Sequence, residues 1–171
     1  MSSSSKHPTA DLKITAVAWA VAAQVWPLLV LSGLLQATAL AWTARSGDPV
    51  PARMAWVLLA KPAALGLVGS FALHEVAHVL VLKRISTVTH ITIERTACRT
   101  SVIPQGTMTT RQMAVVALAG PSACVAMAAV LCLSRLDGSL SWWYLAHIAF
   151  LLPVFGDGKV LWRSCREMLP R

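Results

Sequence analysis

Two histidines and a glutamate in the segment HEVAH, residues 74–78, have the side chains and the spacing to bind and use a metal ion. Because an α-helix makes one turn every 3.6 residues, His74 and His78 lie on the same helix face. Their imidazoles can bind one Zn²⁺, and Glu75 can then reach a water at the metal. The flanking residues are strongly apolar, so this group would lie inside a membrane. The alternative is a buried polar cluster that only holds helices together.

A hydrolytic zinc site needs a third protein ligand and one open position. Asp157 is the best candidate, since it stands between two glycines at the end of the apolar run FLLPVF. His74 precedes Lys83 by nine residues, which is about 13 Å along a helix. Asp157 closely precedes Lys159, so both halves of the site lie a modest distance below the same membrane surface. An aspartate that only shapes a Gly-Asp-Gly turn is the alternative.

Other residues inside the apolar segments have weaker claims to the site. His147 lies about 15 Å before Asp157 if the segment between them is helical. We therefore expect His147 nearer the opposite half of the membrane, in a packing or hydrogen-bonding role. Gly120 and Pro121, in AGPSAC, interrupt a long apolar segment. They can loosen a helix, let another backbone approach closely, and shape the wall of a catalytic cleft.

The composition is that of a membrane protein with a single domain. The chain has 171 residues, of which 56% are hydrophobic and 13% charged, whereas soluble domains carry about 25% charged residues. We expect residues 1–13 to form a retained cytoplasmic tail and residues 14–171 one membrane-embedded domain, with its core at about 54–163. Nucleic-acid binding is not expected, because the basic residues behind the net charge of +8 stand at the ends of apolar segments. The cysteines have no CxxC spacing, which argues against a disulfide framework or a cysteine zinc site.

Four apolar segments are long enough to cross a bilayer, which takes about 20 residues. They run from 14 to about 43, from about 54 to 82, from 112 to 133, and from 142 to 153 with a less regular continuation towards 162. Pro27 predicts a kink or tilt in the first. If the N-terminus is cytoplasmic, the inner segments carry 11 Lys and Arg residues and the outer ones three or four, which predicts that both termini are cytoplasmic. The inner residues are Lys6, Lys13, Lys83, Arg84, Arg95, Arg99, Arg111, Lys159, Arg163, Arg166 and Arg171, and the outer ones are Arg45, Arg53, Arg135 and, just inside a span, Lys61.

The stretch from Ile85 to Thr110 differs from the apolar segments around it. Its sequence ISTVTHITIE alternates β-branched and polar residues, which is typical of a strand. We expect a small hairpin or sheet at the membrane surface, between the second and third spans. The predicted fold is therefore an all-α polytopic membrane protein of about four transmembrane helices with this membrane-associated β element.

The chain resembles the site-2 protease family of intramembrane zinc metalloproteases (peptidase family M50) from about Gly66 to Leu161. HEVAH matches the HExxH of that family, AGPSAC its Gly-Pro element, and LLPVFGDG the segment that ends in Asp-Gly. The resemblance implies that one Zn²⁺ per chain is bound by His74, His78 and Asp157, with Glu75 as the general base. It also implies that the first span is an addition to a three-helix core, and that this is a minimal member without a PDZ or CBS domain.

Two positions depart from the pattern of the family. The Gly-Pro element usually carries an asparagine three residues after the proline, and that place is Cys124 here; a second asparagine commonly precedes the LLP, and that place is Phe150. These asparagines are thought to position the substrate backbone or polarise the cleft. By position, Gly120, Pro121 and Cys124 are the candidate substrate-cleft residues.

The expected function is hydrolysis of peptide bonds in membrane-spanning or membrane-associated proteins, in a bacterial inner or plasma membrane. The expected partners are such a substrate, membrane lipids and a regulatory membrane protein. A first alternative is a catalytically weak or inactive relative that acts as a membrane-bound partner or chaperone, which the missing asparagines favour. A second is a small metal transporter with a pathway through His74, His78, His147 and Asp157.

Overall fold

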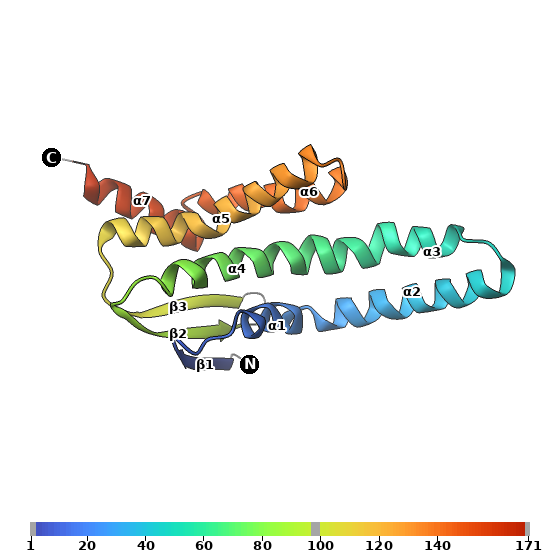
Figure 1. Cartoon of the computed structure of the whole chain (residues 1–171), viewed down its shortest axis with the longest axis horizontal. Coiled ribbons are helices and arrows are strands. Elements are labelled where there is room, and N and C mark those ends of the chain that lie inside the picture. Colours follow the sequence, from blue (N-terminus) through green and yellow to red (C-terminus); the bar gives the residue numbers. More distant parts are fainter. Residues whose placement is uncertain (1–2, 97–99, 170–171) are drawn as a thin grey trace.

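The computed structural model describes residues 3–96 and 100–169, and the described chain is mostly helical (Figure 1). Arg99, Arg171 and Cys98 therefore lie outside the described residues. The elements are β1 (Ser3–Pro8), α1 (Ile14–Gln24), α2 (Trp26–Ser46), α3 (Val50–Ala55), the π-helical segments η1 (Trp56–Ala60) and η2 (Pro62–Val68), α4 (Gly69–Leu82), β2 (Val88–Arg95), β3 (Thr100–Gly106), α5 (Thr110–Leu133), α6 (Gly138–Leu145), the 3₁₀ segment η3 (Ala146–Leu151) and α7 (Gly156–Met168).

The long helices are arranged around the helix that runs from α3 to α4. In Figure 1, α2 lies along one side of this helix, α5 and α6 lie along the other, and the sheet and α7 lie at the same end of the molecule. Among the described residues, three helices are long and apolar enough to cross a membrane, at Trp26–Ser46, Val50–Leu82 and Thr110–Leu133. The pair Gly138–Leu151 and Gly156–Met168, bent by 45°, would make a fourth. The expectation of about four long apolar segments is confirmed to this extent.

The first apolar segment is divided, and its prediction as one span from residue 14 is wrong. Helix α1 ends at Gln24 and α2 begins at Trp26, with Val25 between them in a non-helical conformation (φ −107°, ψ 20°). Pro27 lacks an N–H and its ring collides with the carbonyl four residues earlier, so it suits the first turn of a new helix. The 11 residues of α1 are too few to cross a bilayer. Instead α1 packs on α4 and the sheet.

The second segment remains one helix although it contains Pro62. Residues 56–60 and 62–68 adopt the wider π-helical form, whose carbonyls accept from five residues ahead. This widening accommodates the proline ring, which would otherwise break the helix. The helix therefore continues straight to the histidines at its far end.

The β element expected between the second and third apolar segments is present as a hairpin, β2–β3. A third strand, β1, comes from N-terminal residues that were expected to form a tail, so this part of the prediction is wrong. It pairs antiparallel with β2, from Ser3 opposite Arg95 to Pro8 opposite His90, so that the strand order is β1-β2-β3. The N-terminal segment thus forms one edge of the sheet, and β3 forms the other.

An apolar core lies where the sheet meets α1 and the end of α4. Its side chains come from these elements and the loops that join them: Leu12, Val17, Ala20, Val79, Leu82, Ile85, Val88, Ile91 and Ile93. A β-bulge between Val88 and His90 shifts the alternation of β2, so that Val88, Ile91 and Ile93 all face the core. Packing the sheet on α4 in this way fixes β3 beside the histidines.

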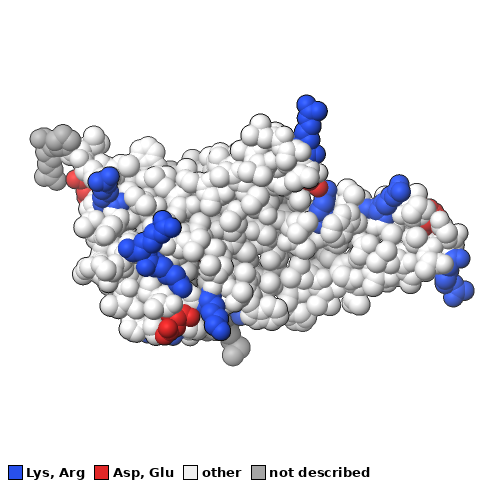
Figure 2. Space-filling model, viewed as in Figure 1, with Lys and Arg blue, Asp and Glu red and all other residues white. Residues whose placement is uncertain are grey.

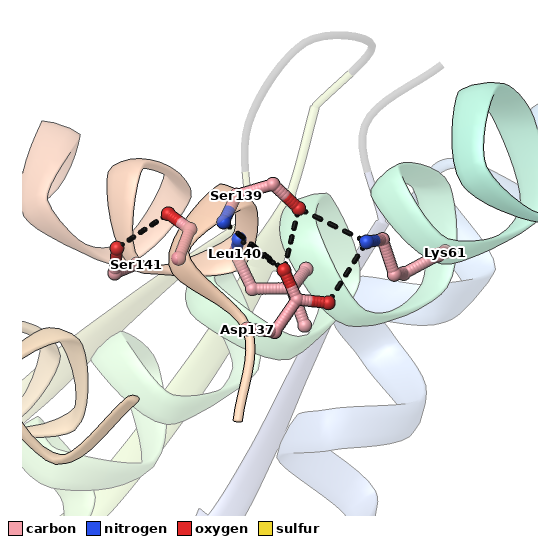
Figure 3. A network of polar contacts seen from close by, with 6 residues as sticks. Lys61, Asp137, Ser139, Leu140 and Ser141 are labelled. Carbon is pink, nitrogen blue, oxygen red and sulfur yellow. Dashed lines mark hydrogen bonds and ion pairs between the residues drawn. The ribbon is translucent and has the colours of Figure 1, made fainter. Parts of the chain in front are cut away.

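A partly buried lysine at the other end of the molecule is paired with a carboxylate and a hydroxyl group. Lys61 donates to Asp137 Oδ2 at 2.8 Å and to Ser139 Oγ at 2.9 Å (Figure 3). Asp137 also caps α6, because its Oδ1 accepts from the backbone N–H groups of Ser139 and Leu140. The hydrogen bonds from Lys61 and Ser139 hold the pKa of the Asp137 carboxyl well below its usual range. This network joins the α3–α4 helix to α6.

Candidate metal centre

The donor atoms of His74, His78 and Asp157 lie close together. His74 Nε2 lies 3.0 Å from Asp157 Oδ2, His78 Nε2 lies 3.4 Å from the same oxygen, and the two Nε2 atoms are 3.1 Å apart. Zn–N and Zn–O distances of about 2.0–2.1 Å place the ligand atoms of a tetrahedral site about 3.3 Å apart. The three donors could therefore hold a metal ion, and their separation and chemical type are compatible with zinc.

Helix α4 supplies both histidines, and α5 leaves room for them at Gly120. The two rings pack edge to face, with centroids 4.7 Å apart, and both are buried. A Cβ at Gly120 would lie 2.6 Å from His78 Nε2 and 2.8 Å from His74 Nδ1. Any other residue at this position would push the imidazoles away. The glycine of the Gly-Pro element is therefore required by the histidine pair itself.

The tautomer of His78 is set by the backbone of α5. Its Nδ1–H donates to the carbonyl oxygen of Val116 at 2.7 Å. A neutral imidazole with a proton on Nδ1 has its lone pair on Nε2. That lone pair faces His74 Nε2 and Asp157 Oδ2, as it would for a metal ligand held by an outer hydrogen bond.

Asp157 enters the site because the chain turns sharply before α7. A Cβ at Gly158 would lie 1.9 Å from the carbonyl oxygen of Leu152, so glycine is needed for this close approach. Asp157 stands in the first turn of α7, where the helix dipole favours a carboxylate. Asp157 can therefore shape the turn and act as a ligand at the same time, since it lies at a helix end and also reaches the histidines.

A cavity of about 280 Å³ opens beside the three donors, between α4, α5, β3 and α7. Glu75 lines the same cavity as His74, His78 and Asp157 and is partly buried. The remaining walls are mainly apolar and include Phe71, Val102, Pro104, Met108, Met113, Val116, Ala117, Phe150, Phe155 and Val160. The cavity therefore combines a charged end at the donors with walls that suit apolar side chains.

Strand β3 borders this cavity with its unpaired edge. Its only partner among the described strands is β2, on the other side. A proline fits within a strand when its missing N–H faces away from the neighbour, and Pro104 pairs with Ile91 of β2. Because backbone direction alternates along a strand, Val102 and Thr100 also direct their N–H and C=O groups to the free edge.

The predicted position of His147 is wrong, because the chain does not continue as one helix. Helix α6 ends at Leu145, and η3 and the 45° bend follow. The His147 ring consequently lies 5.2 Å from the ring of His74, and it is 3% exposed. Its predicted packing and hydrogen-bonding role is present: Nδ1 donates to the carbonyl of Trp143 at 3.1 Å, and the ring packs on Phe71.

The three candidate cleft residues lie behind the histidines and are not among the residues that line the cavity. Pro121 and Cys124 are fully buried, and the Cys124 thiol donates to the carbonyl of Ser70 at 3.4 Å. Gly120 contacts the imidazoles, as described above. The structure therefore places these residues as support for the donors.

Sequence reasoning missed an aromatic wall around His74. Phe150 lies 5.1 Å from the His74 ring and 5.0 Å from Phe155, measured between ring centroids. Phe71 packs on Phe150 and on His147. Phe71 stands three residues before His74, so helical spacing could have placed it on this face; the positions of Phe150 and Phe155 depend on the bend between η3 and α7.

Comparison of the chain with protein-family models, with curated proteins and with solved structures finds no match. The likeness to the site-2 protease family therefore stays a prediction. Function has to be inferred from the donor atoms and from the cavity beside them.

Proposed function

We propose that this protein is an intramembrane zinc metalloprotease of the site-2 protease type, which hydrolyses peptide bonds in membrane-spanning or membrane-associated proteins. One observation carries the proposal: two imidazoles and a carboxylate converge at ligand distance on a cavity that Glu75 also lines. Two nitrogen ligands and one oxygen ligand with an adjacent glutamate are typical of hydrolytic zinc sites. His74, His78 and Asp157 would hold the ion.

The chemistry divides between the ion and Glu75. When bound, Zn²⁺ supplies a Lewis acid that lowers the pKa of a water and polarises a carbonyl. The Glu75 carboxylate accepts the proton of the attacking water and then donates it to the leaving nitrogen, as a general base followed by a general acid. The buried Val116 hydrogen bond keeps His78 in the tautomer this arrangement needs.

The free edge of β3 supports binding of an extended substrate. A helical peptide bond is shielded by its own hydrogen bonds, so a substrate helix has to unwind before cleavage. An unwound segment can add to β3 as a further strand, with hydrogen bonds to Val102 and Thr100. Its side chains would enter the apolar part of the cavity, beside Phe71 and Phe150, which favours large apolar residues near the cleaved bond.

The charges support a membrane orientation with both termini in the cytoplasm. Figure 2 shows Lys and Arg side chains over the sheet and α7, and a second group towards the α2–α3 and α5–α6 turns, with uncharged surface between them. The end with the sheet carries the excess of basic residues, which favours the cytoplasmic side. On this placement the metal centre lies near the cytoplasmic surface, where water can reach it. The cell membrane of a bacterium is the proposed location.

The direct test compares purified wild-type protein with Glu75→Gln in detergent or liposomes, using single-span peptides as substrates. Glu75→Gln should retain zinc and lose about 10²–10⁴-fold in cleavage rate, the usual contribution of general acid–base catalysis. Glu94→Gln, in the sheet, is the matched control and should cleave at the wild-type rate. Full activity in Glu75→Gln would contradict the assigned role.

A second candidate is a non-proteolytic relative that uses the zinc site to bind a membrane partner. Phe150 favours it, because this aromatic ring packs against His74 at a position where the resembled family commonly has asparagine. It predicts bound zinc and tight binding of a single-span peptide with no cleavage product over long incubation. A transport pathway is less well supported, since His147 joins the other donors at a single depth.

A further inference from the structure

Two buried nitrogens at the back of the metal centre have no hydrogen-bond partner among the described residues. They are Nδ1 of His74 and Nε2 of His147. The two rings are neighbours, with centroids 5.2 Å apart and planes inclined by 47°. A ring nitrogen of each, together with the Cys124 thiol, forms a group whose atoms lie within 4.8 Å of one another. Unpaired buried polar atoms are costly, so this arrangement calls for an explanation.

The protons on the two rings are complementary. His74 directs Nε2 at the metal centre, so a neutral ring carries its proton on Nδ1, which is then a donor. His147 donates through Nδ1 to the carbonyl of Trp143, so its Nε2 has a free lone pair and is an acceptor. One unpartnered nitrogen is therefore a donor and the other an acceptor.

We propose that His147 is a positioning residue for the metal centre: one buried water accepts a hydrogen bond from His74 Nδ1–H and donates one to His147 Nε2. This inference rests on the proposed zinc site. One ring nitrogen of each histidine lies within 4.8 Å of the other, a distance that one water can bridge with two hydrogen bonds of about 2.8 Å. Cys124 lies in the same group, and its sulfur can accept a weak third hydrogen bond from such a water.

The surroundings hold His147 rigidly in this role. Its ring is 3% exposed and packs edge-on against Phe71, at 4.9 Å between centroids. Phe150 lies against both His147 and His74, at 5.2 Å and 5.1 Å. A fixed acceptor orients His74 and raises the basicity of its Nε2, as outer hydrogen bonds do for metal-binding histidines.

The test replaces His147 by leucine, which fills similar space without an acceptor, and by glutamine, whose side-chain oxygen can take the place of Nε2. Zinc affinity is measured by chelator competition on purified full-length protein, and the visible spectrum of the Co²⁺-loaded protein reports ligand geometry. His147→Leu should lose about 10–100-fold in zinc affinity and show an altered Co²⁺ spectrum. His147→Gln should recover most of the affinity and the wild-type spectrum.

His90→Leu is the matched control, because it removes an imidazole from β2 and should leave both readouts unchanged. Wild-type zinc affinity and spectrum in a folded His147→Leu protein would overturn the inference, and the proposed zinc site would stand. Equal loss in the leucine and glutamine variants would also overturn it, because the acceptor would then be irrelevant. A second zinc ion in the wild type that His147→Leu loses would make the group a metal site and exclude the positioning role. Zinc-free wild-type protein would refute the proposed function together with this inference.

Discussion

The two polar clusters inside the apolar helices differ in how their groups are paired. At one end, the ammonium of Lys61 lies against the carboxylate of Asp137, and Ser139 completes the hydrogen bonds (Figure 3). At the other end, two imidazole nitrogens and one carboxylate oxygen converge with lone pairs facing one another. The first cluster is neutral and complete, as a structural link should be. The second offers three ligand atoms that could hold a cation, and buried ionisable groups of this kind usually mark a functional site.

The largest effect is expected at Gly120, because the cluster of His74, His78 and Asp157 has room only if this position lacks a side chain. Gly120→Ala adds a Cβ at 2.6–2.8 Å from both imidazoles, so the donor atoms must move apart. We expect zinc affinity to fall by about 10–100-fold, the range seen when metal ligands lose their support. Chelator competition measures it. Gly138→Ala, where a Cβ meets nothing within 4 Å, is the control, and an equal loss there would contradict this explanation.

The free edge of β3 can be probed without disturbing the sheet. Val102→Pro removes an N–H that faces the cavity side, as Pro104 already does two residues later. Loss of one substrate hydrogen bond, worth about 1 kcal/mol, should raise KM several-fold with little change in zinc content. Ile103→Pro is the contrasting variant, because its N–H faces β2 and its loss should destabilise the sheet. Unchanged KM in Val102→Pro would argue against strand addition.

The smallest effects are expected at the paired cluster. Asp137→Asn weakens the link to Lys61 and the cap of α6, so the melting temperature should fall by a few degrees while zinc affinity and cleavage stay at wild-type levels. The depressed pKa of Asp137 gives the pH dependence its sign: the stabilisation is present above the carboxyl's unfolded pKa of about 3.9 and declines as pH falls below it. The difference in melting temperature between the two proteins should therefore shrink progressively as the pH falls below about 4. A large loss of zinc in Asp137→Asn would show that the clusters are coupled.

The sequence correctly predicted those features that depend on the residue pattern within a single helix or strand. The spacing of His74 and His78, the lengths of the apolar runs and the alternation after Ile85 all depend on periodicity within one element. Asp157 was found because the basic residues near it and near Lys83 place both ends of the site at one depth.

What the sequence did not reveal depends on contacts between elements. SSSKHP shows no alternation of apolar residues, and it becomes a strand only because the edge of β2 is available. Distances extrapolated at 1.5 Å per residue misplaced His147, because α6 ends after two turns and the chain bends before α7. The hydrogen bond to Val116 and the ring of Phe150 follow from how α4, α5 and η3 pack.

The zinc content of purified protein tests the central claim most directly. Wild-type protein purified from cells grown in zinc-supplemented medium should contain about one Zn²⁺ per chain. Folded His78→Ala and Asp157→Ala variants prepared in the same way should contain almost none. Circular dichroism on the same samples confirms that the helices remain. Wild-type protein without zinc, or full zinc occupancy in Asp157→Ala, would contradict the site described here.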